Sequence, residues 1–126
     1  MEFLTVDDVI RLHAHVITVT GGRAILRDSG LLESAVAMPS MTYEGKFLHA
    51  DIFEQVAAYL FHIAENQPFV NGNTRTAVAA GLVFLSMNGI EIDESADTQL
   101  YKTMKAIANK QLDRKEIAHV LRNLVR

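Results

Sequence analysis

The segment from Gln67 to Arg75, with the sequence QPFVNGNTR, contains the residue types best suited to binding an anion. Pro68 ends one helical pattern and Asn73 begins the next, so the segment is expected to be a loop followed by a helix N-terminus. The free N–H groups of a first helical turn attract anions. Gly72 would let a bound group approach the backbone, and Arg75 offers a planar, permanent charge suited to phosphate. Spacing alone is explained equally well by an ordinary interhelical turn with a surface arginine.

Composition narrows the classes of protein to consider. The chain has 126 residues, which is enough for one domain with a single core. Its 49% hydrophobic and 21% charged residues fit a soluble globular protein. The net charge of -3 argues against non-specific nucleic-acid binding. The absence of cysteine excludes disulfides, thiolate metal sites and a cysteine nucleophile.

Neither a leader nor a membrane span is expected from the sequence. The first residues contain no basic region followed by a long apolar run, which a signal peptide would need. The most apolar run, 78–85, is shorter than the roughly 18 residues of a membrane span. We therefore expect a cytoplasmic protein with neither nucleic acid nor membrane among its partners.

Helical periodicity accounts for most of the first half of the chain. Apolar residues recur at helical spacing after Thr5, a good N-cap, and the pattern ends at Gly21. A short helix follows Asp28 and stops at Pro39. Residues 40–50 are mixed in character, and we expect a loop or short hairpin there.

The next helix is expected to be central. It opens at Asp51, with Glu54 at capping-box spacing, and ends near Asn66. Its residues are apolar around most of the circumference, which is typical of a buried helix. Another mostly apolar helix, rich in small residues that permit close packing, runs from about Asn73 to Asn88.

Two further helices complete the pattern. Asp93 or Ser95 is expected to cap the fifth, and Asp113, with Glu116 three residues later, is expected to open the sixth. The sequence thus predicts a compact all-α fold of about six helices, as a single domain over residues 1–126.

The histidines are poor candidates for a metal site or a general base. His13 and His15 are two residues apart on a helix and cannot face one point. His62 is expected to be a partly buried structural residue of the central helix. His49 lies in the segment 40–50, where it could reach the loop but is expected to be exposed.

The loop and its surroundings resemble the Fic/Doc (Fido) family. The family signature, His-x-Phe-x-(Asp/Glu)-Gly-Asn-x-Arg, follows a central helix and opens the next one, and residues 67–75 match it at most positions. Similarity to the death-on-curing (Doc) branch extends to the segments 21–35, 51–54 and 80–89. The resemblance therefore covers nearly the whole chain.

The resemblance implies a transferase that uses ATP with Mg²⁺. Fic proteins typically transfer AMP to a protein hydroxyl, whereas the Doc branch resembles a toxin that phosphorylates a translation factor and is restrained by a small antitoxin. The segment 40–50 would correspond to the flap that docks the target's backbone. By resemblance, Phe69 anchors the loop, and the nucleotide phosphates are bound by Gly72, Asn73, Thr74 and Arg75.

The chain departs from the signature at the positions that carry the chemistry. Gln67 replaces the histidine that serves as general base, and a neutral amide cannot take a proton near neutral pH. Asn71 replaces the acidic residue that holds Mg²⁺, and its neutral carbonyl should bind that cation less well. Thr74 stands where Gly or Lys is usual, and Val78 where longer signatures have a second arginine.

Two functions are consistent with these observations. The first is a Doc-like toxin that transfers phosphate or AMP from ATP to a protein hydroxyl and is weakened or inactive because of Gln67. The alternative is a catalytically dead Fido domain that acts as a nucleotide- or protein-binding module. Gln67 is either natural divergence or an inactivating change, and the departures at Asn71 and Thr74 favour divergence.

Overall fold

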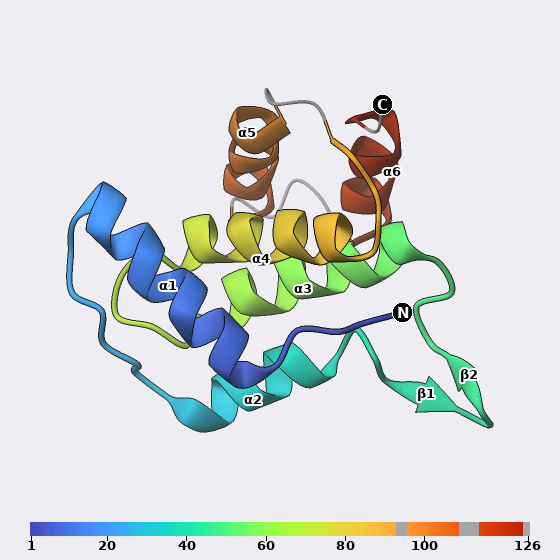
Figure 1. Cartoon of the computed structure of the whole chain (residues 1–126), viewed down its shortest axis with the longest axis horizontal. Helices are drawn as coiled ribbons and strands as arrows, with labels where there is room; N and C mark the ends of the chain where they lie inside the picture. Colours follow the sequence, from blue (N-terminus) through green and yellow to red (C-terminus); the bar gives the residue numbers. More distant parts are fainter. Residues whose placement is uncertain (93–95, 109–113, 125–126) are drawn as a thin grey trace.

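The structure, a computed structural model, describes residues 1–92, 96–108 and 114–124. Within these residues it contains six helices and one short hairpin, whose arrangement is shown in Figure 1. In chain order the elements are α1 (Val6–Thr20), α2 (Ser29–Ala37), β1 (Thr42–Tyr43), β2 (Lys46–Phe47), α3 (Ile52–Asn66), α4 (Asn73–Met87), α5 (Ala96–Ala108) and α6 (Arg114–Leu124). The predicted all-α class with about six helices is therefore confirmed.

The pair α3 and α4 forms the centre of the fold. α2 packs against one side of α3 and α6 against another, while α1 and α5 pack against α4 (Figure 1). Small residues on α4 allow the central pair to approach closely. A Cβ added at Gly81 would lie 3.1 Å from Val56 Cγ1 and 3.2 Å from Leu60 Cδ2, both on α3. The prediction of a central helix beginning after Asp51 is confirmed.

Capping side chains define where α1 and α3 begin. The Thr5 hydroxyl accepts a hydrogen bond from the Asp8 N–H at 3.1 Å, and the Asp8 carboxylate accepts one from the Thr5 N–H at 2.8 Å. This bond from the Thr5 backbone is the main cause that lowers the pKa of Asp8. Asp51 caps α3 by accepting from the Glu54 N–H at 2.8 Å. The Glu54 carboxylate accepts from the Ala50 N–H instead of completing the box at Asp51.

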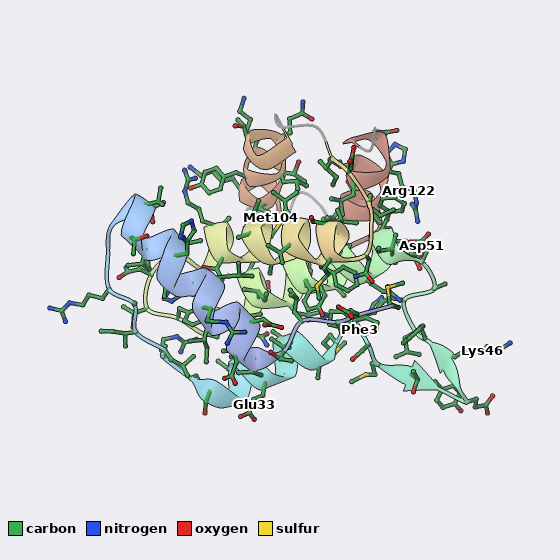
Figure 2. The ribbon with its side chains drawn as sticks, in the orientation of Figure 1. Phe3, Glu33, Lys46, Asp51, Met104 and Arg122 are labelled. Carbon is green, nitrogen blue, oxygen red and sulfur yellow. The ribbon has the colours of Figure 1, made fainter. Side chains whose placement is uncertain are left out.

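The N-terminus and α6 are both tied to α3. The Leu4 N–H donates to the Tyr59 hydroxyl at 2.9 Å, and burial raises the pKa of Tyr59 to about 12. On the other side, Arg122 of α6 donates to Asp51 at 2.7 Å (Figure 2). Because the two side chains of that ion pair are 41% and 47% exposed, it contributes little to stability.

Two further predictions can be compared with the structure. The expected hairpin is present as β1 and β2, joined by a turn in which Glu44 and Gly45 have positive φ. None of the helices in the described part of the chain is long and apolar enough to cross a membrane. The caps expected at Asp93, Ser95 and Asp113 lie outside the described residues.

Candidate functional site

The loop between α3 and α4 begins at Gln67, which ends α3 in the left-handed conformation, with φ 47° and ψ 59°. Its N–H donates to the Ile63 carbonyl at 3.2 Å, while its side chain is exposed. Across residues 1–92, 96–108 and 114–124, the Gln67 amide forms no hydrogen bond with another side chain or the backbone. The position of the family's base therefore presents a neutral amide to solvent.

Phe69 and Asn73 close the loop on itself. Phe69 is 2% exposed and belongs to the main apolar cluster. Its N–H donates to Asn73 Oδ1 at 2.9 Å, and Asn73 Nδ2 donates to the Phe69 carbonyl at 2.8 Å. The Asn73 side chain thus satisfies both backbone groups of Phe69 and is directed at the loop, so it does not cap α4.

Gly72 opens α4 and leaves the helix N-terminus unblocked. It adopts φ 75° and ψ 21°, a left-handed conformation that glycine takes without strain. The first backbone bond of the helix runs from the Thr76 N–H to the Gly72 carbonyl at 2.9 Å, and no side chain caps the helix. In the described part of the chain, the N–H groups of Asn73, Thr74 and Arg75 have no acceptor. This arrangement suits a bound anion.

Two side chains of α5, which no sequence motif singles out, join the site. The Arg75 guanidinium carbon lies 4.2 Å from the centre of the Tyr101 ring, and Lys105 Nζ lies 5.0 Å from the same centre. Neither cation forms an ion pair within the described residues. Helical spacing places Tyr101 and Lys105 on one face of α5, but nothing in the sequence relates that face to Arg75.

Both carbonyl oxygens of Asn71 accept hydrogen bonds from other parts of the chain. Its side-chain carbonyl accepts a hydrogen bond from the Arg23 N–H at 3.1 Å, and its backbone carbonyl bonds to His13 at 2.7 Å. The Mg²⁺ that the family implies prefers several charged or water oxygens. Here the side chain of Asn71 offers Mg²⁺ one neutral carbonyl oxygen, which already accepts the hydrogen bond from the Arg23 N–H. No group of three His, Asp or Glu side chains suited to a metal occurs among the described residues. The loop therefore does not fit Mg²⁺.

The segment between α1 and α2 runs alongside the loop. The N–H groups of Arg27 and Asp28 donate to the Pro68 carbonyl at 2.7 and 3.0 Å, and the Val70 N–H donates to the Ile25 carbonyl at 3.0 Å. These bonds form a short antiparallel contact between the two segments. They hold the loop at a fixed distance from the α1–α2 connection.

Arg27 also supports the unusual backbone at the end of α3. Its Nε donates to the Gln67 carbonyl at 2.8 Å, and its Nη2 donates to the Asn66 carbonyl at 3.0 Å. A cation at a helix C-terminus satisfies free carbonyls and interacts favourably with the helix dipole. Sequence reasoning missed this role, since the residues lie far apart along the chain.

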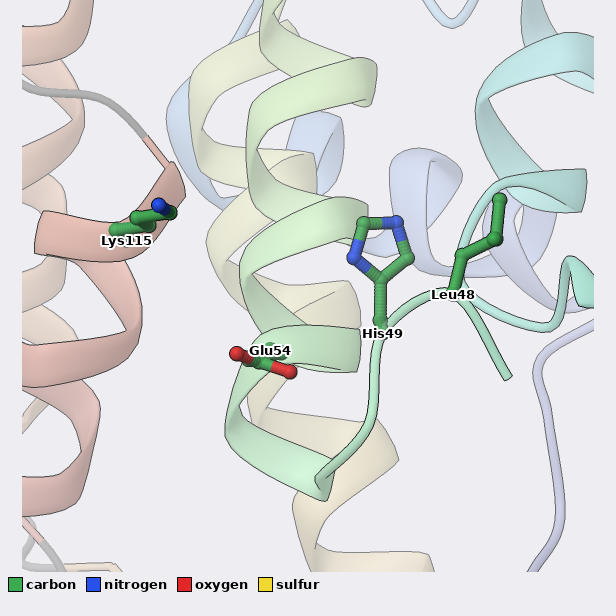
Figure 3. A pocket seen from close by; sticks show the side chains of 4 residues that line it. All are labelled: Leu48, His49, Glu54 and Lys115. Atoms are coloured by element: carbon green, nitrogen blue, oxygen red, sulfur yellow. The ribbon is translucent and has the colours of Figure 1, made fainter. Parts of the chain in front are cut away.

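The expectation that His49, in the segment 40–50, could reach the loop is wrong, whereas target docking by this segment stays a prediction. The hairpin leads into the N-terminal end of α3, whereas the loop follows the C-terminal end (Figure 1). The 15 residues of α3 span about 22 Å at the usual helical rise. His49 lies at the hairpin end, where it lines a pocket of about 230 Å³ with Leu48, Glu54 and Lys115 (Figure 3). It cannot serve as a base for the loop.

The chain is similar in sequence to a described family and to named proteins. The family model described as "Fic/DOC family" matches residues 3–85. A protein named "Toxin Doc", from Mycolicibacterium smegmatis, is 34% identical over 118 residues, covering 93% of this chain and 88% of that protein. A protein named "Protein kinase doc", from Escherichia phage P1, is 29% identical over 126 residues, covering 98% of this chain and 96% of that protein.

Proposed function

The chain belongs to the Fic/Doc family, and we propose that it is a Doc-like toxin whose loop from Gln67 to Arg75 binds the phosphates of ATP. The observation that carries the proposal is the open N-terminus of α4. Three backbone N–H groups of the first turn of this helix have no acceptor among the residues that the structure describes, and Arg75 adds a permanent positive charge beside them. Gly72 supplies the left-handed turn that leads the chain into this helix.

The reaction we propose is phosphoryl transfer from ATP to a hydroxyl of a target protein. The hydroxyl oxygen forms a bond to the γ-phosphorus, the bond from that phosphorus to the bridging oxygen breaks, ADP leaves, and the hydroxyl proton passes to solvent water. The name of the phage relative, "Protein kinase doc", favours this transfer over AMP transfer. A target among the translation factors is the expectation from the family.

Gln67 limits this reaction. The attacking hydroxyl must give up its proton, and the exposed Gln67 amide can orient the hydroxyl but cannot accept the proton. General-base catalysis is typically worth about 10²–10⁴-fold in rate, so we propose that the chain is weakened by about that factor. The relative named "Toxin Doc" suggests that a small antitoxin restrains the active form.

The test compares the chain with its Gln67→His variant. The left-handed backbone at Gln67 is one that histidine adopts comparatively readily, so the substitution should not disturb the loop. Each protein is incubated in bacterial lysate with ATP labelled at the γ-phosphate or at the α-phosphate, and each is expressed to follow growth. We expect γ-label on protein and growth arrest with Gln67→His, and much less with the unchanged chain.

A matched control and two contrary outcomes complete this test. Adding Arg75→Ala to Gln67→His should remove the labelling while leaving the base in place. Labelling from the α-phosphate alone would replace phosphate transfer with AMP transfer. No labelling by Gln67→His, with ATP binding retained, would reject the toxin. That result would favour the second candidate function, a catalytically dead nucleotide- or protein-binding module. The neutral side chains at Gln67 and Asn71 are the reason for considering this candidate.

A further inference from the structure

His13 lies buried beneath the loop. α1 turns it inward, where it is 2% exposed, whereas His15 faces solvent. His13 contacts Phe69 and Asn71, which lie far away in the sequence and belong to the loop of the candidate site. It is neither part of the family signature nor accessible to a target hydroxyl, so it has no role as a base.

One contact of His13 is a hydrogen bond to the loop backbone. Its Nε2 lies 2.7 Å from the Asn71 carbonyl oxygen. A carbonyl can only accept, so Nε2 carries the proton and donates. The carbonyl belongs to the residue directly before Gly72, where the chain turns into α4.

A second contact is made by the face of the ring. The His13 and Phe69 rings stack with their centres 3.7 Å apart and their planes within 6° of parallel. Phe69 is in turn held by two hydrogen bonds to Asn73, the first residue of α4. His13 therefore contacts the loop at two points that flank Val70, and each point leads directly into the first turn of α4.

Gly72 shows how tightly α1 supports the loop. A Cβ added to Gly72 would lie 3.1 Å from Ile17 Cδ1 and 3.8 Å from His13 Cδ2. Real side chains rarely tolerate the first of these distances, and the positive φ of Gly72 also disfavours a side chain. The buried face of α1 thus packs directly against the loop at Gly72.

We propose that His13 is a positioning residue for the loop, acting chiefly through its hydrogen bond to the Asn71 carbonyl, with its ring packed on Phe69. It holds Gly72 and the first-turn N–H groups of α4 in the orientation that an anion requires. The expected effect of His13 on ATP affinity rests on the proposed function. Its expected effect on the conformation of the loop does not. His13 itself touches no substrate.

The test uses two substitutions that separate the contacts. His13→Phe keeps a flat ring against Phe69 but removes the donor to Asn71. His13→Gln supplies an amide N–H that can reach the Asn71 carbonyl but lacks the ring. Val9→Ala is the matched control, because Val9 is buried one turn earlier on α1 and contacts the core. It should lower the melting temperature without altering the loop.

The first readout is hydrogen exchange of the Phe69, Val70 and Thr76 backbone amides, which donate hydrogen bonds in the unliganded loop. We expect exchange about tenfold faster in His13→Phe than in Val9→Ala, and near the unchanged rate in His13→Gln. The second readout is ATP affinity by calorimetry. We expect His13→Phe to bind ATP about tenfold more weakly than the unchanged chain. The affinity of His13→Gln should lie within about threefold of that of the unchanged chain.

The outcomes separate this inference from the proposed function. Loop exchange in His13→Phe that is no faster than in Val9→Ala would overturn the role of His13. Should His13→Phe not fold, His13→Gln is compared with Val9→Ala: loop exchange about tenfold faster in His13→Gln, although it keeps a donor to the Asn71 carbonyl, would overturn the role of the hydrogen bond. If no form binds ATP but His13→Phe still accelerates loop exchange, the proposed function fails and the positioning role stands.

Discussion

Asn73 holds Phe69 through a reciprocal pair of hydrogen bonds, accepting from the Phe69 N–H at 2.9 Å and donating to the Phe69 carbonyl at 2.8 Å. The pair closes the loop on the first residue of α4. It makes the loop's shape depend on one amide side chain, because only an amide offers both a donor and an acceptor in this geometry.

Replacing that amide should therefore loosen the loop. Asn73→Ala leaves two backbone groups of a nearly buried residue without partners, and we expect the free energy of unfolding to fall by about 1–3 kcal/mol. Thr74→Ala, at the next position, is the control and should change it by less than about 0.5 kcal/mol. Urea denaturation measures both. Equal effects of the two substitutions would show that the reciprocal bonds are not important for stability.

The Tyr101 ring is expected to preorganise Arg75. Its centre lies 4.2 Å from the guanidinium carbon, a contact worth about 0.5–2 kcal/mol. Tyr101→Leu should weaken ATP binding by about two- to tenfold, because the guanidinium loses its fixed position, whereas Tyr101→Phe should retain the affinity. Calorimetry supplies the measurement. Tighter binding by Tyr101→Leu would mean that the ring competes with phosphate for Arg75.

The neutral side chain at Asn71 leads to a prediction about Mg²⁺. Since the Asn71 carbonyl already accepts from the Arg23 N–H, Mg²⁺ should change ATP affinity little in the unchanged chain. Asn71→Asp adds a negative charge at the same place, and Mg²⁺ should then increase the affinity by about tenfold or more. Titrations with and without Mg²⁺ give the comparison. An equal response to Mg²⁺ in both proteins would remove position 71 from any metal site.

The buried hydroxyl of Tyr59 predicts how stability depends on alkaline pH. Burial raises its pKa to about 12 in the folded chain, whereas an unfolded tyrosine has a pKa of about 10. Its contribution is therefore fully present below about pH 10 and is lost as the pH rises towards 12. Denaturation from pH 8 to 11.5 should show this loss, and Tyr59→Phe should flatten it. An unchanged slope in Tyr59→Phe would assign the loss to other groups.

The elements whose ends are set by neighbouring residues were predictable from the sequence. The caps Thr5 and Asp51 and the terminator Gly21 act on residues within one helical turn, so local spacing identifies them. The position of the loop between two apolar helices followed for the same reason. The burial of Phe69 agrees with its place in the signature, although the ligand-binding roles of the loop residues stay predictions.

What the sequence could not predict depends on tertiary contacts. Arg27 contacts the end of α3, His13 lies under Asn71, and Tyr101 lies against Arg75 only because the helices fold together. The hairpin was expected correctly, but the expectation that His49 within this segment could reach the loop was wrong. Local patterns identify a hairpin without indicating which end of a long helix it will lie beside.

The central claim is that the loop retains a phosphate site although its base position is neutral. Calorimetric titration of ATP into the chain and into Arg75→Ala tests this most directly, with circular dichroism to verify that both are folded. We predict measurable binding to the unchanged chain and a loss of at least about tenfold in Arg75→Ala, because an exposed charge–phosphate contact is removed without disturbing the core. Equal ATP affinity in the two folded proteins would contradict the account.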